Sequence, residues 1–329
     1  MTGWDVASEV LIPLGEPLLS LPHTLDCGQA FRWRQRESGW WVGVVRGHAV
    51  RLRREGDLVR GQIYPPLAET EHSTLSTQHP SACSRHPVPG TQSPVAFLSS
   101  YLRLDVDLQA LYRAFAGADP WIARAAATYP GLRVLSQEPQ ETLLSYVCST
   151  ANSVPRISRS VEQMSRRYGR HIAHLDGEDY HAFPTPAELA AAPGAELWNE
   201  CGLGWRAANL QKVARELLAL PEGWPEQLRP MPYAEAKARL MGLPGIGPKI
   251  ADCVCLFALG KDEAVPVDTH IWAIARDLFD VRIPTRTLTP ATYETVSRLF
   301  VERYGPFAGW AQEYLYLWRR ASQGRVSSL

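Results

Sequence analysis

A short glycine-rich turn between two helical stretches constrains this chain more than any other feature. The turn is Leu243-Pro244-Gly245-Ile246-Gly247, and the spacing of apolar residues predicts helices over 234–241 and 249–259. A turn of this kind presents backbone N–H groups to a phosphate at a helix N-terminus. Gly245 and Gly247 allow backbone conformations and a close approach that side chains would prevent. The pattern predicts a helix–hairpin–helix that contacts a nucleic-acid backbone; an ordinary helix–helix turn is the alternative.

Two side chains near this turn have the chemistry to cut a base from its sugar. Lys249 begins the second helix, and its amine can act as a nucleophile. Asp268 stands at the predicted start of another helix, where a capping carboxylate is held rigidly. Such a carboxylate can stabilise positive charge that grows on the sugar as the base leaves. We therefore predict a catalytic pair. A solvated lysine and a carboxylate that only caps its helix fit the same pattern.

Two further residues extend the predicted site. Cys253 lies four residues after Lys249, so both side chains share one helix face, which should border a cavity. His270 follows Asp268 by two residues and can meet a phosphate; a surface histidine is the alternative.

The composition is that of a globular protein, with 45% hydrophobic and 21% charged residues. The 34 basic and 34 acidic residues cancel, so the net charge argues neither for nor against nucleic acid. The first residues lack the pattern of a signal peptide, and no apolar run is long enough to span a bilayer. The six cysteines are scattered along the chain, so we expect a reduced intracellular protein that makes no membrane contact.

The patterning divides the 329 residues into unlike parts. Short alternating runs with turn signals predict an N-terminal antiparallel β domain over 1–64, to which 95–106 is expected to return. Residues 65–94 are rich in Pro, Ser, Thr and His and predict a flexible insertion, in which Cys83 and the histidines lack the spacing of a metal site. Helical periodicity over 107–329 predicts a helical body that contains the helix–hairpin–helix at 234–259. The fold class is therefore α+β.

Taken together, these residues resemble the helix–hairpin–helix/Gly-Pro-Asp superfamily of DNA glycosylases, and within it the eukaryotic-type 8-oxoguanine DNA glycosylases. The resemblance covers most of the chain outside 65–94. The matching stretches are Gly28-Gln29-Ala30-Phe31-Arg32-Trp33, Tyr101-Leu102-Arg103-Leu104-Asp105-Val106, Gly202-Leu203-Gly204-Trp205-Arg206, Leu243 to Trp272, and Gly305-Pro306-Phe307-Ala308-Gly309-Trp310-Ala311-Gln312.

The resemblance implies a base-excision repair enzyme with both glycosylase and lyase steps. Lys249 is expected to attack C1′ and form a Schiff base, with Asp268 as its catalytic partner. Cys253 and Tyr316 are expected to sandwich the extruded base, Gln312 to read its Watson–Crick edge, and the Gly28 carbonyl to accept the N7–H that distinguishes 8-oxoguanine from guanine.

The resemblance also implies how the duplex is held. Trp205 and Arg206 correspond to the residue that fills the vacated stack and to its neighbour; a core tryptophan is the alternative for Trp205. Arg156 and Asn152 are expected to contact the orphaned cytosine, although the arginines of this stretch could contact phosphates or solvent instead. One departure concerns Ala151, which stands where the family has an asparagine, so a contact to that cytosine is missing or replaced.

No cofactor is expected. A related branch that resembles endonuclease III binds an iron–sulfur cluster through four cysteines after the aspartate, and no cysteine follows Cys255 here. No metal site is predicted either. The expected partner is double-stranded DNA containing 8-oxoguanine, bound by a monomer. The expected compartment is the nucleus or mitochondrion for a eukaryotic source, and the cytoplasm or nucleoid for a bacterial one. The alternatives are a glycosylase for another damaged or alkylated base and a non-catalytic DNA-binding module.

Overall fold

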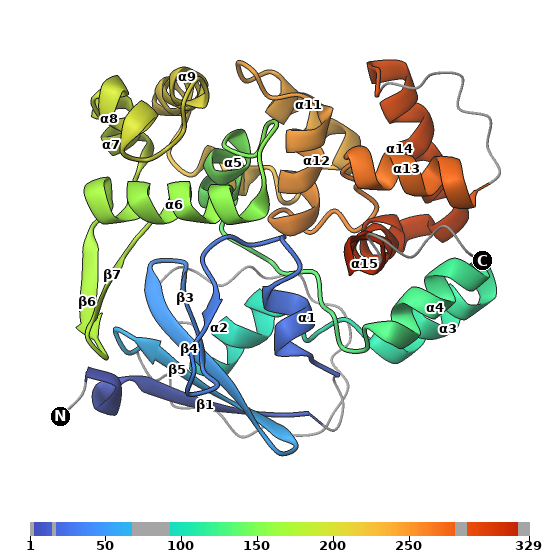
Figure 1. Cartoon of the computed structure of the whole chain (residues 1–329), viewed down its shortest axis with the longest axis horizontal. Helices are drawn as coiled ribbons and strands as arrows, with labels where there is room; N and C mark the ends of the chain where they lie inside the picture. Colours follow the sequence, from blue (N-terminus) through green and yellow to red (C-terminus); the bar gives the residue numbers. More distant parts are fainter. Residues whose placement is uncertain (1–2, 15–17, 68–92, 280–287, 322–329) are drawn as a thin grey trace.

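A computed structural model describes residues 3–14, 18–67, 93–279 and 288–321. In these residues an antiparallel sheet lies beside a helical body, which confirms the α+β prediction (Figure 1). The predicted insertion at 65–94 lies outside the described residues, apart from its two ends.

The sheet has the strand order β1-β5-β4-β3-β2, and neighbouring strands pair antiparallel throughout. The strands are β1 (Ser8–Pro13), β2 (Arg34–Gln35), β3 (Trp41–Val45), β4 (His48–Glu55) and β5 (Leu58–Tyr64). Burial alternates along β5, which is typical of a strand with one face on a core. Every residue of β3 is buried, so this strand is covered on both faces.

Different elements cover the two faces of the sheet. On one face, α1 (Leu21–Leu25) and α2 (Pro94–Tyr101) share a hydrophobic cluster with the strands, which includes Val50, Ile63 and Leu98. On the other face, the 3-10 helix Gly3–Val6 and a hairpin of β6 (His171–Leu175) and β7 (Glu178–His181) supply Trp4 and Leu175. The helical periodicity of 107–329 had not indicated this hairpin.

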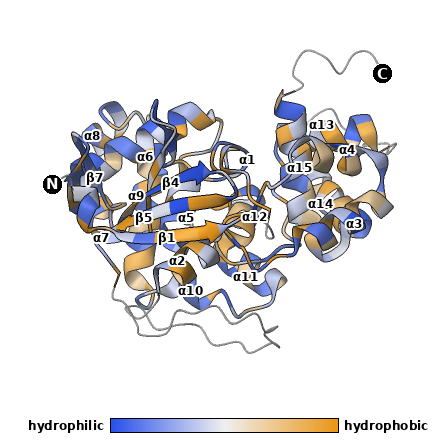
Figure 2. Cartoon of the chain, turned by 90° about the horizontal axis from the view of Figure 1, so that it is seen from below, coloured by the Kyte–Doolittle hydropathy of each residue, from blue (hydrophilic) through white to orange (hydrophobic). Residues whose placement is uncertain are grey.

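The body is built from the helices that follow α2. They are α3 (Leu108–Ala118), α4 (Pro120–Thr128), α5 (Pro139–Val147), α6 (Val154–Tyr168), α7 (Pro186–Ala191), α8 (Gly194–Asn199), α9 (Arg206–Ala219), α10 (Trp224–Gln227), α11 (Tyr233–Met241), α12 (Pro248–Phe257), α13 (Thr269–Leu278), α14 (Pro290–Tyr304), the 3-10 helix Gly305–Phe307 and α15 (Ala308–Ala321). In Figure 2, α3, α4, α13, α14 and α15 gather in one lobe, and α5 to α11 lie with the sheet in the other.

A buried arginine joins the sheet side to the helical body. Arg133 is fully buried, and its guanidinium donates to the carbonyls of Leu18, Arg103 and Val106. Burial lowers the pKa of Arg133 to about 10, which leaves it charged at neutral pH. Charge-assisted hydrogen bonds to several carbonyls offset the cost of taking this group out of water. The residue therefore fixes the loop before α1 against the segment that leads to α5.

Candidate active site and DNA interface

A cavity of about 830 Å³ is lined by residues of both lobes. Its walls come from distant parts of the sequence: the loop after α1, the segment between α5 and α6, the start of α12, the stretch before α13 and the middle of α15. The residues predicted from the sequence that line it are Gly28, Asn152, Gly245, Gly247, Lys249, Cys253, Asp268, His270, Gln312 and Tyr316. Arg156, Trp205 and Arg206 lie outside this lining.

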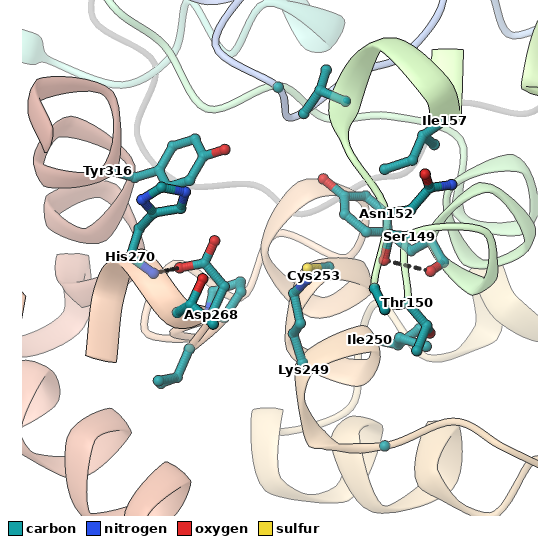
Figure 3. A pocket seen from close by; sticks show the side chains of 18 of the residues that line it. Ser149, Thr150, Asn152, Ile157, Lys249, Ile250, Cys253, Asp268, His270 and Tyr316 are labelled. Atoms are coloured by element: carbon teal, nitrogen blue, oxygen red, sulfur yellow. Dashed lines mark hydrogen bonds between the residues drawn. The ribbon is translucent and has the colours of Figure 1, made fainter. Parts of the chain in front are cut away.

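Lys249 enters the cavity from the first turn of α12. Gly247 is the N-cap of this helix, and Pro248 occupies its first position, where the absent N–H costs nothing. Figure 3 shows the Lys249 side chain extending into the pocket towards Cys253, with Asp268 across from it. Within the described residues, its amine has no hydrogen-bond or ion-pair partner. The amine is therefore available to a bound molecule.

Asp268 is the N-cap of α13, as predicted. Its Oδ1 accepts from the backbone N–H groups of His270 and Ile271, each at 2.9 Å. The residues before it, Val265 to Val267, are buried, so the carboxylate stands at the end of a fixed segment. Only Oδ1 is used by the cap, and Asp268 also lines the cavity. The capping role is thus real and leaves one oxygen for a ligand.

A buried acid that the sequence analysis missed braces this arrangement. Asp252 accepts hydrogen bonds from the hydroxyls of Tyr233 (2.7 Å) and Tyr293 (2.6 Å) and an ion pair from Lys237 (3.0 Å). The Tyr293 hydroxyl also accepts from the N–H of Val267, one residue before the catalytic candidate. Burial raises the pKa of Asp252, and Lys237 and the two tyrosines oppose that shift. An aspartate inside an apolar helix was the available signal.

The loop that carries Gly28 is held by the residue after it. The Gln29 side chain is fully buried; it donates to the carbonyls of Thr24 (2.9 Å) and Arg133 (2.8 Å) and accepts from the N–H of Leu135 (2.8 Å). Gly28 has φ +105°, and a Cβ there would lie 3.2 Å from Val154. Within the described residues, no donor is bonded to the Gly28 carbonyl. Gln29 thus holds a rigid loop in which the Gly28 carbonyl is a free acceptor.

The remaining walls are apolar or uncharged. Cys253 is buried, and burial raises the pKa of its thiol far above the usual range, so the sulfur is neutral despite the nearby Lys249. Tyr316 is half-buried and meets the His270 ring edge-on, with 5.5 Å between the ring centroids. The Oε1 of Gln312 is buried without a hydrogen-bond partner. An amide oxygen left unpaired in this way is ready to accept from a ligand.

The two glycines of the hairpin differ. Gly245 has φ +71°, and a Cβ there would lie 2.3 Å from the side chain of Asn209, which agrees with the predicted need for glycine. Gly247 has φ −87°, a value open to any residue, and a Cβ there would meet nothing. The expectation of a special backbone conformation is therefore wrong for Gly247, while its close approach to a phosphate stays a prediction. Its N–H lies at the N-terminus of α12, where backbone N–H groups can bind an anion.

The predicted DNA-contact residues surround the turn before α6. The Asn152 side chain donates to the Cys148 carbonyl (3.0 Å) and accepts from the N–H of Ser153 (3.0 Å). Arg206 donates to the carbonyls of Thr150 (2.6 Å) and Ala151 (2.7 Å), so it braces this turn from α9. Ala151 has φ +47°, a conformation that asparagine adopts more readily than alanine.

Trp205 and Arg156 project into solvent near this turn. Trp205 is the N-cap of α9 and is 54% exposed, so the alternative of a core tryptophan is wrong. Its ring lies 4.7 Å from the Arg206 guanidinium, which fixes its direction by a cation–π contact. Arg156 is exposed on the first turn of α6 and belongs to the row of arginines along that helix.

No group of three or more His, Cys, Asp or Glu side chains is arranged to hold a metal ion in residues 3–14, 18–67, 93–279 and 288–321. None of the helices in the described part of the chain is long and apolar enough to cross a membrane.

The fold and the cavity define a helix–hairpin–helix protein whose pocket contains a lysine and a capping aspartate. Residues 11–143 match the family described as 8-oxoguanine DNA glycosylase, N-terminal domain, and residues 144–298 match the HhH-GPD superfamily of base excision DNA repair proteins. The chain is 34% identical to the N-glycosylase/DNA lyase OGG1 of Arabidopsis thaliana, over 91% of this chain and 77% of that protein. It is 29% identical to the N-glycosylase/DNA lyase of Saccharomyces cerevisiae, over 91% of this chain and 82% of that one.

Solved structures agree with this fold. The 8-oxoguanine glycosylase/lyase of Clostridium acetobutylicum, solved with double-stranded DNA containing cytosine opposite 8-oxoG, superposes with a TM-score of 0.77 at 23% identity, covering 98% of this chain and 99% of that one. The protein belongs to the N-glycosylase/DNA lyase family of base excision repair enzymes, and it is a bifunctional DNA glycosylase and DNA lyase.

Proposed function

We propose that this enzyme removes 8-oxoguanine from duplex DNA and then nicks the strand. The observation that carries the proposal is the convergence of six side chains and one carbonyl from distant segments on a single cavity, which holds Gly28, Lys249, Cys253, Asp268, His270, Gln312 and Tyr316. Such a cavity is suited to a base that has been swung out of the helix. The relationship to N-glycosylase/DNA lyases supports the same reaction.

The base is recognised at two edges. Cys253 and Tyr316 form apolar walls on its two faces, and the unpaired Oε1 of Gln312 accepts from N–H groups of its Watson–Crick edge. The free carbonyl of Gly28 accepts the N7–H of 8-oxoguanine, whereas guanine has an acceptor at N7. A buried acceptor that faces another acceptor costs about 1–3 kcal/mol, or roughly tenfold to a hundredfold in preference.

Lys249 supplies the nucleophile. Its amine forms a bond to C1′ as the bond from C1′ to the base breaks, and the base leaves with that electron pair and takes up a proton. Asp268 stabilises the positive charge that grows on the sugar. Loss of the amine's protons and opening of the sugar ring give a Schiff base. Removal of a C2′ proton then expels the 3′ phosphate by β-elimination.

The duplex is held around this cavity. Gly245, Gly247 and His270 lie where phosphates of the lesion strand can meet helix N-termini. Trp205 fills the space that the extruded base leaves, and Arg206 holds the turn that carries Asn152. Arg156 contacts the orphaned base or its phosphate. We further propose that the enzyme works inside the cell as a monomer without a cofactor, since catalysis by an amine and a carboxylate needs none.

The proposed role of Trp205, filling the space that the extruded base leaves, is tested by Trp205→Ala. Stacking on an aromatic side chain contributes about 1–3 kcal/mol, so base release from an 8-oxoguanine duplex should slow by roughly tenfold to a hundredfold under single-turnover conditions. Trp198→Ala is the matched control, because Trp198 is exposed to a similar extent (52% against 54%) on α8. An equal decrease in the rate of base release in both variants would contradict this role of Trp205.

The opposite-base preference is tested with 8-oxoguanine placed opposite each of the four bases. We expect the native enzyme to favour cytosine, because Arg156 is exposed on the first turn of α6 and Asn152 lines the cavity. The left-handed backbone of residue 151 accepts asparagine, so Ala151→Asn should raise the cytosine preference by roughly fivefold to tenfold through an added hydrogen bond. Ala151→Gly relaxes the same backbone without adding a donor and serves as the control. Equal excision opposite all four bases would refute the cytosine preference.

A further inference from the structure

The cavity contains a carboxyl group that the proposed reaction does not use. Glu313 lies on α15, is only 2% exposed, and lines the cavity beside Gln312. Its Oε1 is buried without a hydrogen-bond partner. A buried carboxyl oxygen without a partner is costly, and such a cost is typical of functional sites.

The Glu313 side chain lies near Cys27, the residue before Gly28, and each group shifts the pKa of the other. The Cys27 thiol itself donates to the Thr24 carbonyl at 3.4 Å. Arg320, two helical turns further along α15, donates to the Cys27 carbonyl at 3.1 Å. A Cβ on Gly28 would lie 3.6 Å from the same guanidinium and 3.8 Å from the Tyr316 hydroxyl. Glu313 and Gly28 thus line the same cavity, and Glu313 lies near the residue that precedes Gly28.

Titratable groups from several elements interact with Glu313 and govern its pKa. They are Cys27 after α1, Tyr146 on α5, Cys253 on α12, Asp268 before α13, and Tyr316 and Arg320 on α15. Burial raises the pKa of Glu313 to about 7, and the Asp268 charge adds to this rise, while the Cys27 thiol and Arg320 oppose it. Burial also raises the pKa of both thiols and both tyrosines, so these groups stay neutral near pH 7.

We propose that Glu313 is a specificity-determining residue that, when ionised, strengthens the selection of bases carrying an N–H at the Gly28 edge. A negative charge near the Gly28 loop attracts the N7–H dipole of 8-oxoguanine and repels the lone pair at N7 of guanine. Glu313 acts through the potential at the Gly28 carbonyl and is a positioning residue without a role in bond breaking. This inference rests on the proposed recognition of 8-oxoguanine.

Thermodynamic linkage gives the direction and size of the expected pH effect on selectivity. A lesion that binds better to the ionised carboxyl lowers its pKa, and each unit of that decrease is a tenfold gain in affinity across the titration. Below about pH 6 the carboxyl is neutral and the gain is absent; above about pH 8 the gain is complete. The ratio of the guanine Kd to the 8-oxoguanine Kd should therefore rise by roughly threefold to tenfold between these limits.

The test measures this ratio in the Lys249→Gln background, which leaves the DNA intact. Duplexes with 8-oxoguanine or guanine opposite cytosine are bound at fixed ionic strength from about pH 5.5 to about pH 8.5. We expect Glu313→Gln, which keeps the shape but not the charge, to hold the ratio at its low-pH value throughout. Glu313→Asp should restore the pH dependence. Glu302→Gln, an exposed change on α14, should leave the profile unaltered.

Each other outcome overturns the proposal. A ratio that rises with pH equally with and without the Glu313→Gln change, or that does not rise in either protein, excludes Glu313 as the source of selectivity while leaving 8-oxoguanine recognition intact. The absence of any 8-oxoguanine preference at every pH in all variants overturns the proposed function itself. If Glu313→Gln lowers the thermal stability, the pH profile of the Glu313→Asp protein decides the test. A Glu313→Asp protein without a rise of the ratio with pH would contradict the proposal.

Discussion

Replacing Lys249 by glutamine is expected to abolish strand cleavage while leaving lesion binding in place. Glutamine has nearly the length of lysine, but its amide nitrogen is not a nucleophile, so no bond to C1′ forms. The loss of base release should be at least about 10³-fold, as expected when a covalent nucleophile is removed. Binding should persist because the walls and the edge-reading groups come from other segments. Product formation on a labelled 8-oxoguanine duplex and gel-shift affinity measure the two effects separately.

The matched control is Lys212→Gln. Lys212 is exposed on α9 and is absent from the cavity lining, so this change removes a lysine with little structural effect. Nicking at the native rate by the Lys249→Gln enzyme would show that the nucleophile has been misassigned. Loss of DNA binding together with cleavage would indicate that Lys249 contributes to binding and would leave its chemical role unsupported.

The second large effect is expected from Asp268→Asn. Asparagine also caps helices well, so the bonds to the N–H groups of His270 and Ile271 should remain and the fold should be kept. The negative charge is lost, and base release under single-turnover conditions should slow by about 10²- to 10⁴-fold. The affinity for the lesion should change little by comparison, because the charge matters most when positive charge develops on the sugar.

A second substitution separates the charge from the cap. Asp268→Ala removes both, so it should match Asp268→Asn in rate and lose an additional ~1 kcal/mol of stability, measured by thermal unfolding. If Asp268→Asn releases the base at the native rate, the carboxylate has only a capping role. If Asp268→Ala alone is slow, the cap rather than the charge controls the reaction.

The sequence was most informative where the chemistry is local. The hairpin, the cap at Asp268 and the shared face of Lys249 and Cys253 each depend on a few neighbouring residues, and the structure contains all three. Helical periodicity and the turn signals of the strands likewise predicted the α+β class. The expectation for Gly247 failed because a Gly-x-Gly pattern does not reveal which of its glycines has a positive φ.

What the sequence did not indicate depends on contacts between distant segments. Gln29 is fixed by groups more than one hundred residues away, and the Asp252 network joins three helices. Burial, which governs the pKa of Glu313, is also a property of the assembled fold. Periodicity shows which face of an element is apolar, but it does not show which polar groups meet inside the core.

The most direct measurement of the central claim is the site of covalent attachment. The native enzyme is incubated with an 8-oxoguanine duplex in the presence of borohydride, which reduces a Schiff base to a stable bond, and the trapped complex is digested and its peptides are mapped by mass spectrometry. We predict that the sugar remnant is attached to Lys249 alone. Attachment to another amine, or base release with no trapped complex, would contradict the account.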